Sequence, residues 1–319
     1  MAGAPLERIL VTGASGFVGP YLVAALQEAF GSAQIISASP TAAPLPGTLP
    51  VHLDLADLAA PRALVEAMRP QACLHLAAVS HIGHALESPG SAWRINLLGA
   101  LALAEAMQDI APAAPFVHIS TGEVYGLSAN SEPPLSEQSN LAPANLYAAT
   151  KAAADLALGE MALRGLRLVR LRPFNHTGPG QSSDFVVPHI ARQVVTAERA
   201  GAGELVIGAT DRMRDFLDVR DVCRAYVAAL AQVESLPNGI ALNIASGTSR
   251  SIASIVEDLL RLTPARIVVR QEPARLRPND VERVRVGVDR VRTHLGWEPQ
   301  IAWSQTLADV LAYWRGGMP

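Results

Sequence analysis

Arg8-Ile-Leu-Val-Thr-Gly-Ala-Ser-Gly-Phe-Val-Gly19 joins a short apolar run directly to three glycines spaced three residues apart. The continuous apolar residues at its start predict a strand that is buried on both faces, as the strands of a parallel sheet are. Apolar residues at helical spacing follow over 17–30. A strand, a glycine turn and a helix in this order predict the opening unit of a Rossmann-type fold.

Strands and helices continue to alternate up to about residue 172. After the strand at Arg8–Thr12, further strands are expected at Gln34–Ala38, Pro50–Leu53, Ala72–Leu76, Pro115–Ser120 and Leu166–Leu171. Helices are expected near 57–69, 89–110 and 143–164, where apolar residues recur every three or four positions. Right-handed βαβ units built from these elements predict an α/β fold with a Rossmann-type doubly wound parallel sheet.

The three glycines, Gly13, Gly16 and Gly19, allow a tight turn in which backbone N–H groups approach a pyrophosphate at the positive end of the following helix. In this strand–turn–helix context they predict a dinucleotide site. The neighbouring residues expected to line this site are Ser15, Phe17 and Val18.

The pattern of elements changes after Arg172-Pro173. A loop around Gly178-Pro179-Gly180 comes first, followed by a helix at 186–200, a strand and helix over 216–233, a strand at 240–244 and a helix at 304–315. We therefore expect a dinucleotide-binding domain over 1–172, to which 217–245 returns. Residues 173–216 and 246–319 are expected to form a smaller, discontinuous α/β C-terminal portion that binds substrate and closes over a cleft.

Composition narrows the class of protein. The 319 residues are 50% hydrophobic and 17% charged, which suits a globular chain with a sizeable core. A net charge of −3 supplies no basic surplus for a nucleic acid partner. Cys73 and Cys223 lie in apolar surroundings at no metal-ligand spacing, which indicates buried thiols and no metal. Neither a signal peptide nor a membrane-spanning apolar run is evident, so we expect a cytoplasmic protein with no membrane partner.

The end of the second strand bears on the choice of dinucleotide. An acidic residue there ordinarily binds the adenosine ribose of NAD(H). This chain has Ser37-Ala38-Ser39 instead, with neither an acid nor an arginine. The two serines are candidate donors to a 2′-phosphate, so NADP(H) is favoured over NAD(H). Asp54, after the third strand, is either an acceptor for the adenine amino group or part of a helix N-cap.

Tyr147 and Lys151 lie four residues apart, which places them on one face of the expected helix. Lys151 is the only lysine among 26 basic residues. A neighbouring ammonium favours the phenolate and should lower the pKa of the tyrosine toward the working range. Thr121 follows the fifth strand at the carboxyl edge of the sheet, where its hydroxyl would polarise a substrate oxygen. The three side chains predict a proton-transfer site beside the dinucleotide.

With these features the chain resembles the extended short-chain dehydrogenases/reductases, the NAD-dependent epimerase/dehydratase family that acts on nucleotide-linked sugars. The matching motifs are spread over almost the whole chain, at 11–19, His75-Leu-Ala-Ala78, Asn96, Ile119-Ser-Thr-Gly-Glu-Val-Tyr-Gly126, 147–151, Arg172-Pro-Phe-Asn-His-Thr-Gly-Pro-Gly-Gln181, Arg214-Asp-Phe-Leu-Asp-Val-Arg-Asp221, Asn243-Ile-Ala-Ser-Gly247, Arg277-Pro-Asn-Asp280 and Gly296-Trp-Glu-Pro299. Those beginning near Arg172 and at Arg214 most resemble GDP-4-dehydro-6-deoxy-D-mannose reductases, which make GDP-D-rhamnose.

This resemblance implies a role for each matching residue. Thr121, Tyr147 and Lys151 match the catalytic hydroxyl, tyrosine and lysine of the family, and Glu123 matches a carboxylate beside the reacting sugar. Further cofactor contacts would come from Leu55, Leu76, Ala77, Ala78, Asn96 and Pro173. Substrate contacts would come from Ser80, His81, Asn175, Val186, Arg214, Arg277 and Asp280, with the two arginines on the diphosphate.

The reaction expected from these residues is hydride transfer from NAD(P)H to the C4 ketone of a GDP-linked 6-deoxyhexulose, in which Tyr147 protonates the new alkoxide. The expected substrate is GDP-4-dehydro-6-deoxy-D-mannose or another nucleotide-linked sugar. A homodimer or homotetramer is the expected assembly, through the alanine-rich helices near 89–110 and 143–164.

Three alternatives to the reductase remain open. In a 4,6-dehydratase for GDP-mannose or another nucleotide sugar, Glu123 would be the base. Gly122 disfavours that reading, because many dehydratases carry an aspartic acid at this position and glycine donates no proton. A nucleotide-sugar C4 epimerase is disfavoured by the missing acid after the second strand. A non-catalytic dinucleotide sensor would have no need for Thr121, Tyr147 and Lys151 together.

Overall fold

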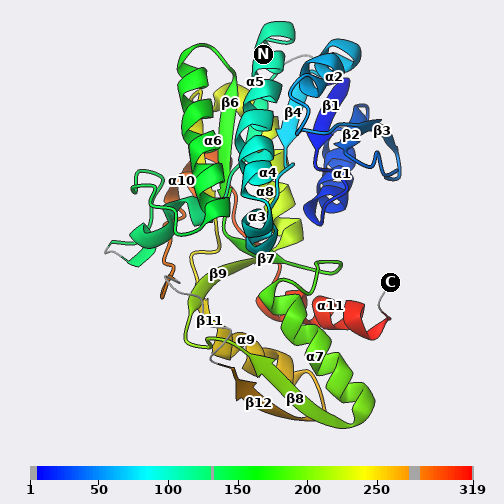
Figure 1. Cartoon of the computed structure of the whole chain (residues 1–319), viewed down its shortest axis with the longest axis vertical. Helices are drawn as coiled ribbons and strands as arrows, with labels where there is room; N and C mark the ends of the chain where they lie inside the picture. The colour runs from blue at the N-terminus through cyan, green and yellow to red at the C-terminus, as the bar shows by residue number, and fades with distance from the viewer. Residues whose placement is uncertain (1–5, 131–132, 273–280, 318–319) are drawn as a thin grey trace.

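A seven-stranded parallel sheet organises the computed structural model, which describes residues 6–130, 133–272 and 281–317. The order of its strands is β10-β6-β5-β4-β1-β2-β3 (Figure 1). They span Arg8–Thr12 (β1), Gln34–Ser39 (β2), Thr48–His52 (β3), Ala72–His75 (β4), Phe116–Ile119 (β5), Leu168–Pro173 (β6) and Ile240–Ile244 (β10). The predicted doubly wound parallel sheet is confirmed, and the strand predicted at 240–244 pairs with β6 at its edge.

Helices cover both faces of this sheet (Figure 1). One face carries α1 (Val18–Ala29), α8 (Val219–Ala231) and α10 (Asp289–Leu295), and the other carries α2 (Ala60–Met68), α5 (Ala100–Ile110) and α6 (Leu146–Leu163). Successive residues of a strand point to opposite faces, so Ile9 and Val11 join the first core and Leu10 joins the second. This two-sided burial explains why β1 is apolar without interruption. The described helices include none that is long and apolar enough to cross a membrane.

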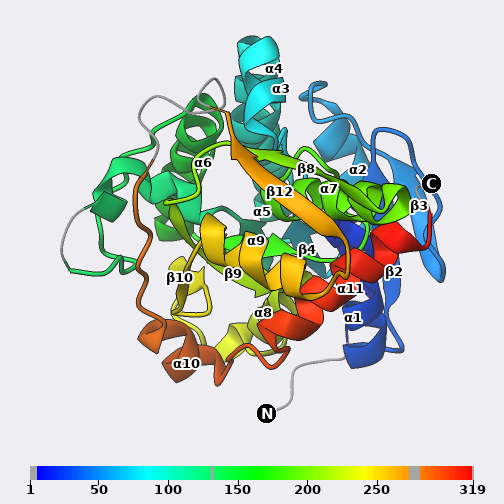
Figure 2. The same cartoon turned by 90° about the horizontal axis from the view of Figure 1, so that it is seen from below.

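A smaller portion lies at one end of the main sheet (Figures 1 and 2). It contains a three-stranded sheet, β11-β9-β7, and a parallel pair, β12-β8. Its elements are β7 (Asn175–Thr177), α7 (Val186–Ala200), β8 (Ala202–Ile207), β9 (Met213–Asp218), β11 (Ser249–Ser251), α9 (Ile252–Arg261), β12 (Arg266–Gln271) and α11 (Trp303–Arg315). The three helices share a third hydrophobic core with β8. The helices predicted at 186–200 and 304–315 are confirmed as α7 and α11.

Local structure departs from the prediction in the smaller portion and at 89–110. No strand was predicted where β7, β8, β11 and β12 lie; most residues of β12 are exposed, so its sequence lacks the apolar run of a buried strand. The single helix expected at 89–110 is α4 (Pro89–Trp93), a π-helical turn (Arg94–Gly99) and α5, preceded by α3 (Ile82–Glu87). A π turn adds one residue to a helical turn, which shifts the apolar pattern too little for a short segment to be told from a continuous helix.

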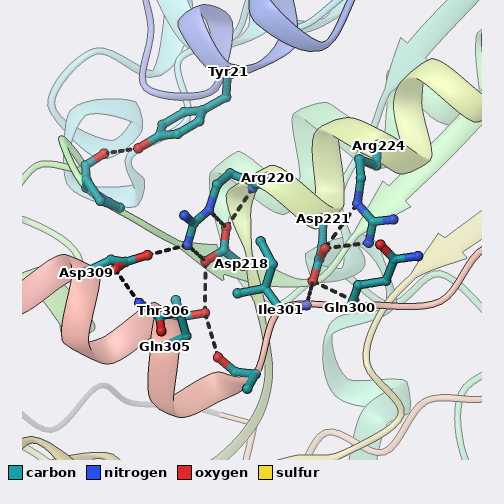
Figure 3. Close-up of polar contacts among 12 residues, drawn as sticks. Tyr21, Asp218, Arg220, Asp221, Arg224, Gln300, Ile301, Gln305, Thr306 and Asp309 are labelled. Carbon is teal, nitrogen blue, oxygen red and sulfur yellow. Dashed lines mark hydrogen bonds and ion pairs between the residues drawn. The ribbon is translucent and has the colours of Figure 1, made fainter. Parts of the chain in front are cut away.

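Charged side chains join the two portions at the start of α8 (Figure 3). Asp218 accepts a hydrogen bond from the Arg220 backbone N at 2.8 Å and another from the Thr306 hydroxyl of α11 at 2.9 Å. The Arg220 guanidinium pairs with Asp218 at 2.7 Å and with Asp309 of α11 at 2.6 Å. Since α8 packs on the main sheet and α11 belongs to the smaller portion, these contacts fix one portion on the other.

A buried ion pair holds α6 against β6. Asp155 of α6 is fully buried, and Arg172 of β6 donates to its two oxygens at 2.7 and 3.0 Å. Arg170 donates to the same carboxylate at 2.9 Å. Burial alone would raise the pKa of Asp155, but the hydrogen bonds and charge of Arg172, with the charge of Arg170, hold it below its usual value. The carboxylate therefore stays charged at neutral pH and balances the buried guanidinium.

Asp155→Ala should destabilise the protein strongly, because it leaves the Arg172 guanidinium buried without a counter-charge. Removing one partner of a buried pair costs about 3–5 kcal/mol. The matched control is Glu160→Ala, since Glu160 pairs with Arg164 on the exposed side of the same helix and should contribute little. Urea unfolding followed by circular dichroism measures both variants, and equal losses of stability would contradict the burial argument.

Candidate active site

The glycine turn lies between the carboxyl ends of β1 and β4. Gly13 has a left-handed φ of +73°, and a Cβ there would stand 2.6 Å from the backbone N of Ala77, in the turn after β4. Gly19 lies against the carbonyl oxygen of Ala14, which leaves no room for a side chain. A Cβ at Gly16 would meet only the Gly13 carbonyl oxygen, at 3.3 Å. The backbone of the turn therefore requires glycine at positions 13 and 19. At position 16 the missing side chain leaves room for a ligand to reach the N-terminus of α1.

The start of α1 fits the pyrophosphate of a dinucleotide. Its N-terminus has no side-chain cap and no acidic residue in the first turn. The Gly19 N donates to the Gly16 carbonyl oxygen at 3.1 Å, and the positive end of the helix dipole is available to an anion. The residues predicted around this anion lie in the turn and in the segment after β4 that packs on Gly13: Ser15, Phe17, Val18, Leu76, Ala77 and Ala78. We infer that they would hold an NAD(P) diphosphate.

On the adenosine side, both predicted serines are buried, Ser39 at 3% exposure, and they differ in the partners of their hydroxyls. Ser37 is 1% exposed, and its hydroxyl shares a hydrogen bond of 2.8 Å with Thr48 of β3. This placement inside the sheet does not favour it as a phosphate donor. Ser39 ends β2, with its hydroxyl 3.5 Å from that of Thr41. Asp54 accepts from the backbone N of Ala56 at 2.8 Å, which closes a local turn before α2.

Leu55 and Pro173 were also predicted to contact the cofactor, and both are buried. Leu55 is buried, and its backbone packs where a Cβ at Gly99 would stand. Pro173 ends β6 at the carboxyl edge of the sheet and is also buried.

The start of α6 brings the predicted proton-transfer residues together. Asn145 caps the helix by accepting from the Ala148 backbone N at 2.8 Å, so Tyr147 lies in the first turn. Burial raises the pKa of Tyr147 to about 12; a hydrogen bond with Thr121 opposes this shift and the charge of Glu123 adds to it. Thr121 is itself buried. The phenol therefore stays protonated at neutral pH.

Lys151 lies one turn further along α6 and is 1% exposed. Its Nζ donates to the Ile119 carbonyl at 2.7 Å, at the end of β5. Burial lowers the pKa of Lys151 to about 8, with the charge of Asp155 opposing the shift. The predicted lowering of the Tyr147 pKa by this lysine is wrong here, because burial of the phenol is the largest influence and raises its pKa.

Glu123 faces the same helix start. Its carboxylate accepts from the Asn145 amide at 3.3 Å, and its backbone N donates to the Thr121 hydroxyl oxygen at 3.2 Å. Asn145 therefore caps α6 and positions Glu123 at once. The sequence analysis missed this residue, although an asparagine directly before a helical pattern is an N-cap signal.

Both the oxygen and the nitrogen of the Asn96 side-chain amide form hydrogen bonds within the protein. Its Oδ1 accepts from the Val79 N at 2.7 Å, and its Nδ2 donates to the Val79 O at 3.2 Å and the Thr150 hydroxyl at 3.0 Å. The Thr150 hydroxyl in turn donates to the Tyr147 carbonyl at 2.8 Å. These hydrogen bonds join the segment after β4 to α6. A direct contact of Asn96 with the cofactor remains a prediction.

The predicted substrate residues come from both portions. Asn175 on β7 pairs with Phe216 of β9, the strand that also carries Arg214, and Val186 begins α7. His81 packs its ring 5.8 Å from that of Phe185, so the segment after β4 touches the start of α7. The remaining predictions are Ser80, which is exposed, and Arg277 and Asp280, which lie outside the described residues.

Sequence comparison identifies the family to which the chain belongs. A family model described as GDP-mannose 4,6 dehydratase matches residues 10–310. The chain therefore belongs to this family of extended short-chain dehydrogenases/reductases, as its motifs predicted, and is an NAD(P)-dependent nucleotide-sugar oxidoreductase. The GDP-6-deoxy-D-mannose reductase of Pseudomonas aeruginosa is 35% identical to it over 313 residues, which cover 97% of each chain.

Solved structures and other relatives show how widely this fold is shared. The structure of RMD from Pseudomonas aeruginosa complexed with NADPH superposes with a TM-score of 0.84 at 32% identity, covering 98% of this chain and 99% of that one. A dTDP-glucose 4,6-dehydratase of Xanthomonas campestris pv. campestris is 28% identical over 96% of this chain and 92% of its own. UDP-glucose 4-epimerase of Thermotoga maritima, at 24% identity, has the same fold with a TM-score of 0.85 over 97% of this chain and 99% of its own.

Gly16→Ala and Gly13→Ala should separate cofactor binding from folding. Gly16→Ala adds a methyl group whose one close neighbour is the Gly13 carbonyl oxygen, at 3.3 Å, so the melting temperature should fall less than in Gly13→Ala while NADPH binds at least about 10-fold more weakly. Gly13→Ala should also lower the melting temperature, because its Cβ meets Ala77 and its φ is positive. Differential scanning fluorimetry and NADPH fluorescence titration measure the two effects. Unchanged NADPH affinity in Gly16→Ala would contradict the assigned site.

Proposed function

We propose that this protein reduces the C4 ketone of GDP-4-dehydro-6-deoxy-D-mannose with NADPH and forms GDP-D-rhamnose. The observation that carries the proposal is the hydrogen bond between the Tyr147 phenol and the Thr121 hydroxyl at the carboxyl edge of the sheet, one helical turn from Lys151. A reduction needs a proton donor for the new alkoxide, and a phenol with a raised pKa is in the required state at neutral pH. The 35% identity to a GDP-6-deoxy-D-mannose reductase supports the choice of substrate.

Each residue of the site has its own role in this proposed reaction. The nicotinamide supplies the hydride when the cofactor is bound. Tyr147 donates its proton to the C4 oxygen, and Thr121 donates a hydrogen bond to the same atom. Lys151 anchors the nicotinamide ribose with its ammonium and stabilises the phenolate that remains. Arg214 and Asn175, on adjacent strands, hold the diphosphate and the sugar.

NADPH rather than NADH is proposed for two reasons. The chain has no acid at the end of β2 that would repel a 2′-phosphate. A relative that superposes with a TM-score of 0.84 was solved with NADPH. Ser39, at the end of β2, is the better placed of the two serines for this phosphate, since Ser37 is bonded to Thr48.

The proposal also assigns the binding of cofactor and of substrate to different parts of the chain. Residues 1–172 with 217–245 would bind the cofactor, and 173–216 with 246–319 would bind the GDP-sugar, to which Arg277 and Asp280 would contribute. A homodimer or homotetramer would form through the helices at 89–110 and 143–164. Their exposed large apolar side chains support such a contact: Trp93, Leu98, Leu156 and Leu163.

A GDP-mannose 4,6-dehydratase is the second candidate, because Asn145 holds the Glu123 carboxylate beside Thr121. Incubation with GDP-4-dehydro-6-deoxy-D-mannose and, separately, with GDP-mannose distinguishes the two. We expect NADPH absorbance to fall with the ketone and GDP-mannose to stay unchanged. Conversion of GDP-mannose without net use of cofactor would instead establish the dehydratase.

Tyr147→Phe should lower kcat for the ketone by at least about 100-fold, since it removes the proton donor. NADPH affinity should change little, because the ring and the helix remain. Tyr313→Phe is the control, as Tyr313 lies on α11, away from the sheet edge. A Tyr147→Phe variant with the wild-type rate would remove the assigned role.

The pH dependence of kcat/KM should follow the protonation of Lys151. Its pKa is about 8, so the ammonium is present below that pH and is lost as the pH rises through it. We expect kcat/KM to be highest below about pH 8 and to fall tenfold per pH unit well above it. Tyr147, with a pKa of about 12, should not titrate in this range. Lys151→Met should be slow and should show no such fall, and a flat wild-type profile up to about pH 10 would contradict the assignment.

A further inference from the structure

The side-chain amide of Asn145 has a fixed orientation. Its Oδ1 accepts a hydrogen bond from the Ala148 backbone N at 2.8 Å, and its own backbone carbonyl accepts one from the Ala149 N at 2.9 Å. The amide oxygen is therefore committed to the first turn of α6. If the amide were turned over, its NH₂ group would face the Ala148 N–H, donor against donor, so Nδ2 has to point away from the helix.

The amide nitrogen points at Glu123. Nδ2 lies 3.3 Å from Glu123 Oε2 and donates to it, because an amide NH₂ group has only hydrogens to offer a carboxylate. Among the residues that the structure describes, none donates to the other carboxylate oxygen, Oε1. The carboxylate also lies at the N-terminal end of α6, where the helix dipole favours a negative charge. One oxygen of Glu123 is thus held by the protein and the other is left for a ligand.

Glu123 is also connected to the proton donor of the site. Its backbone N donates to the Thr121 hydroxyl oxygen at 3.2 Å, and Thr121 is in turn hydrogen-bonded to Tyr147. Tyr147 comes two residues after Asn145, in the first turn of α6, whereas Glu123 belongs to the segment that follows β5. The cap residue therefore fixes the carboxylate relative to the phenol, although the two come from different elements.

Capping alone does not explain an asparagine at position 145. Serine and aspartate cap helices about as well as asparagine does. An aspartate would bring a second carboxylate against Glu123. A serine side chain is one bond shorter, and its single oxygen would have to serve both the Ala148 N and Glu123. Asparagine separates the two tasks, because one of its atoms accepts from the helix and another donates to the carboxylate.

We propose that Asn145 is a positioning residue, which holds one oxygen of Glu123 so that the other accepts a hydrogen bond from a sugar hydroxyl next to the C4 ketone. This inference rests on the proposed function and adds the role of Glu123 to it. Because Glu123 and Tyr147 are fixed at the same helix start, a sugar bound by the carboxylate presents its C4 oxygen to the phenol. Glu123 acts here as an acceptor and transfers no proton.

Asn145→Asp tests this role, since aspartate has the same shape and caps the helix but turns a carboxylate oxygen toward Glu123. KM for GDP-4-dehydro-6-deoxy-D-mannose should rise at least about 10-fold, because repulsion displaces Glu123, while NADPH affinity should stay within about 2-fold. In a Glu123→Gln background the same substitution should change KM by less than about 2-fold, because the glutamine amide can donate to the aspartate. Steady-state kinetics and NADPH fluorescence titration measure these effects.

Thermal unfolding tests the contact without any substrate. Two carboxylates at the helix start should lower Tm by about 2 °C in Asn145→Asp, and this fall should be absent in the Glu123→Gln background. Ser251→Ala is the control for the loss of a helix cap. Ser251 caps α9 by accepting from the Ser254 N at 3.0 Å, so its removal should lower Tm and leave KM unchanged.

Equal rises in KM in both backgrounds would overturn the proposal, since Asn145 would then not act through Glu123. An unchanged KM in Asn145→Asp would overturn it as well. If Asn145→Asp does not fold, Asn145→Ser keeps the cap, loses the amide and is judged by the same comparison. Failure of the wild type to reduce the ketone would refute the proposed function instead, and the Tm cycle would still decide whether Asn145 holds Glu123.

Discussion

The ion pair between Asp155 and Arg172 connects the elements that carry the chemistry. Asp155 lies one turn after Lys151 on α6, and Arg172 lies on β6, immediately before the segment that leads to the substrate residues. The same guanidinium donates to Tyr125, which follows the Thr121 segment. A buried charge tolerates little displacement of its partner, so α6 and β6 cannot slide past each other without a large cost in free energy. The relative positions of phenol, ammonium and hydroxyl depend on this constraint.

The electrostatics of the site suit the proposed reduction. Burial keeps the Tyr147 phenol protonated, as a proton donor must be, and brings the Lys151 ammonium to a pKa of about 8. The ammonium lies against the Ile119 carbonyl, and Asp155 on the same helix favours its charged form. These opposite shifts have one cause, since desolvation disfavours whichever form carries the charge. The site thus holds a neutral acid and a readily titrated cation within one helical turn.

Relatives with this fold include a reductase, a dehydratase and an epimerase. The shared fold therefore does not decide the reaction by itself, and the side chains of the site have to. In this chain the edge carries the Glu123 carboxylate, which accepts a hydrogen bond from Asn145.

The amino-acid sequence by itself determined the parallel sheet, the glycine turn and the pairing of Tyr147 with Lys151 on one helix, because strand burial and helical spacing are local periodicities. Only the tertiary structure decided the pKa of Tyr147, the partners of Asn96 and the packing of the Phe174 ring against Gly122. Each of these depends on residues far apart in the chain, such as Gly122 and Phe174, which are brought together by neighbouring strands β5 and β6. Burial and contact distance are properties of the packed chain, and no short stretch of sequence contains them.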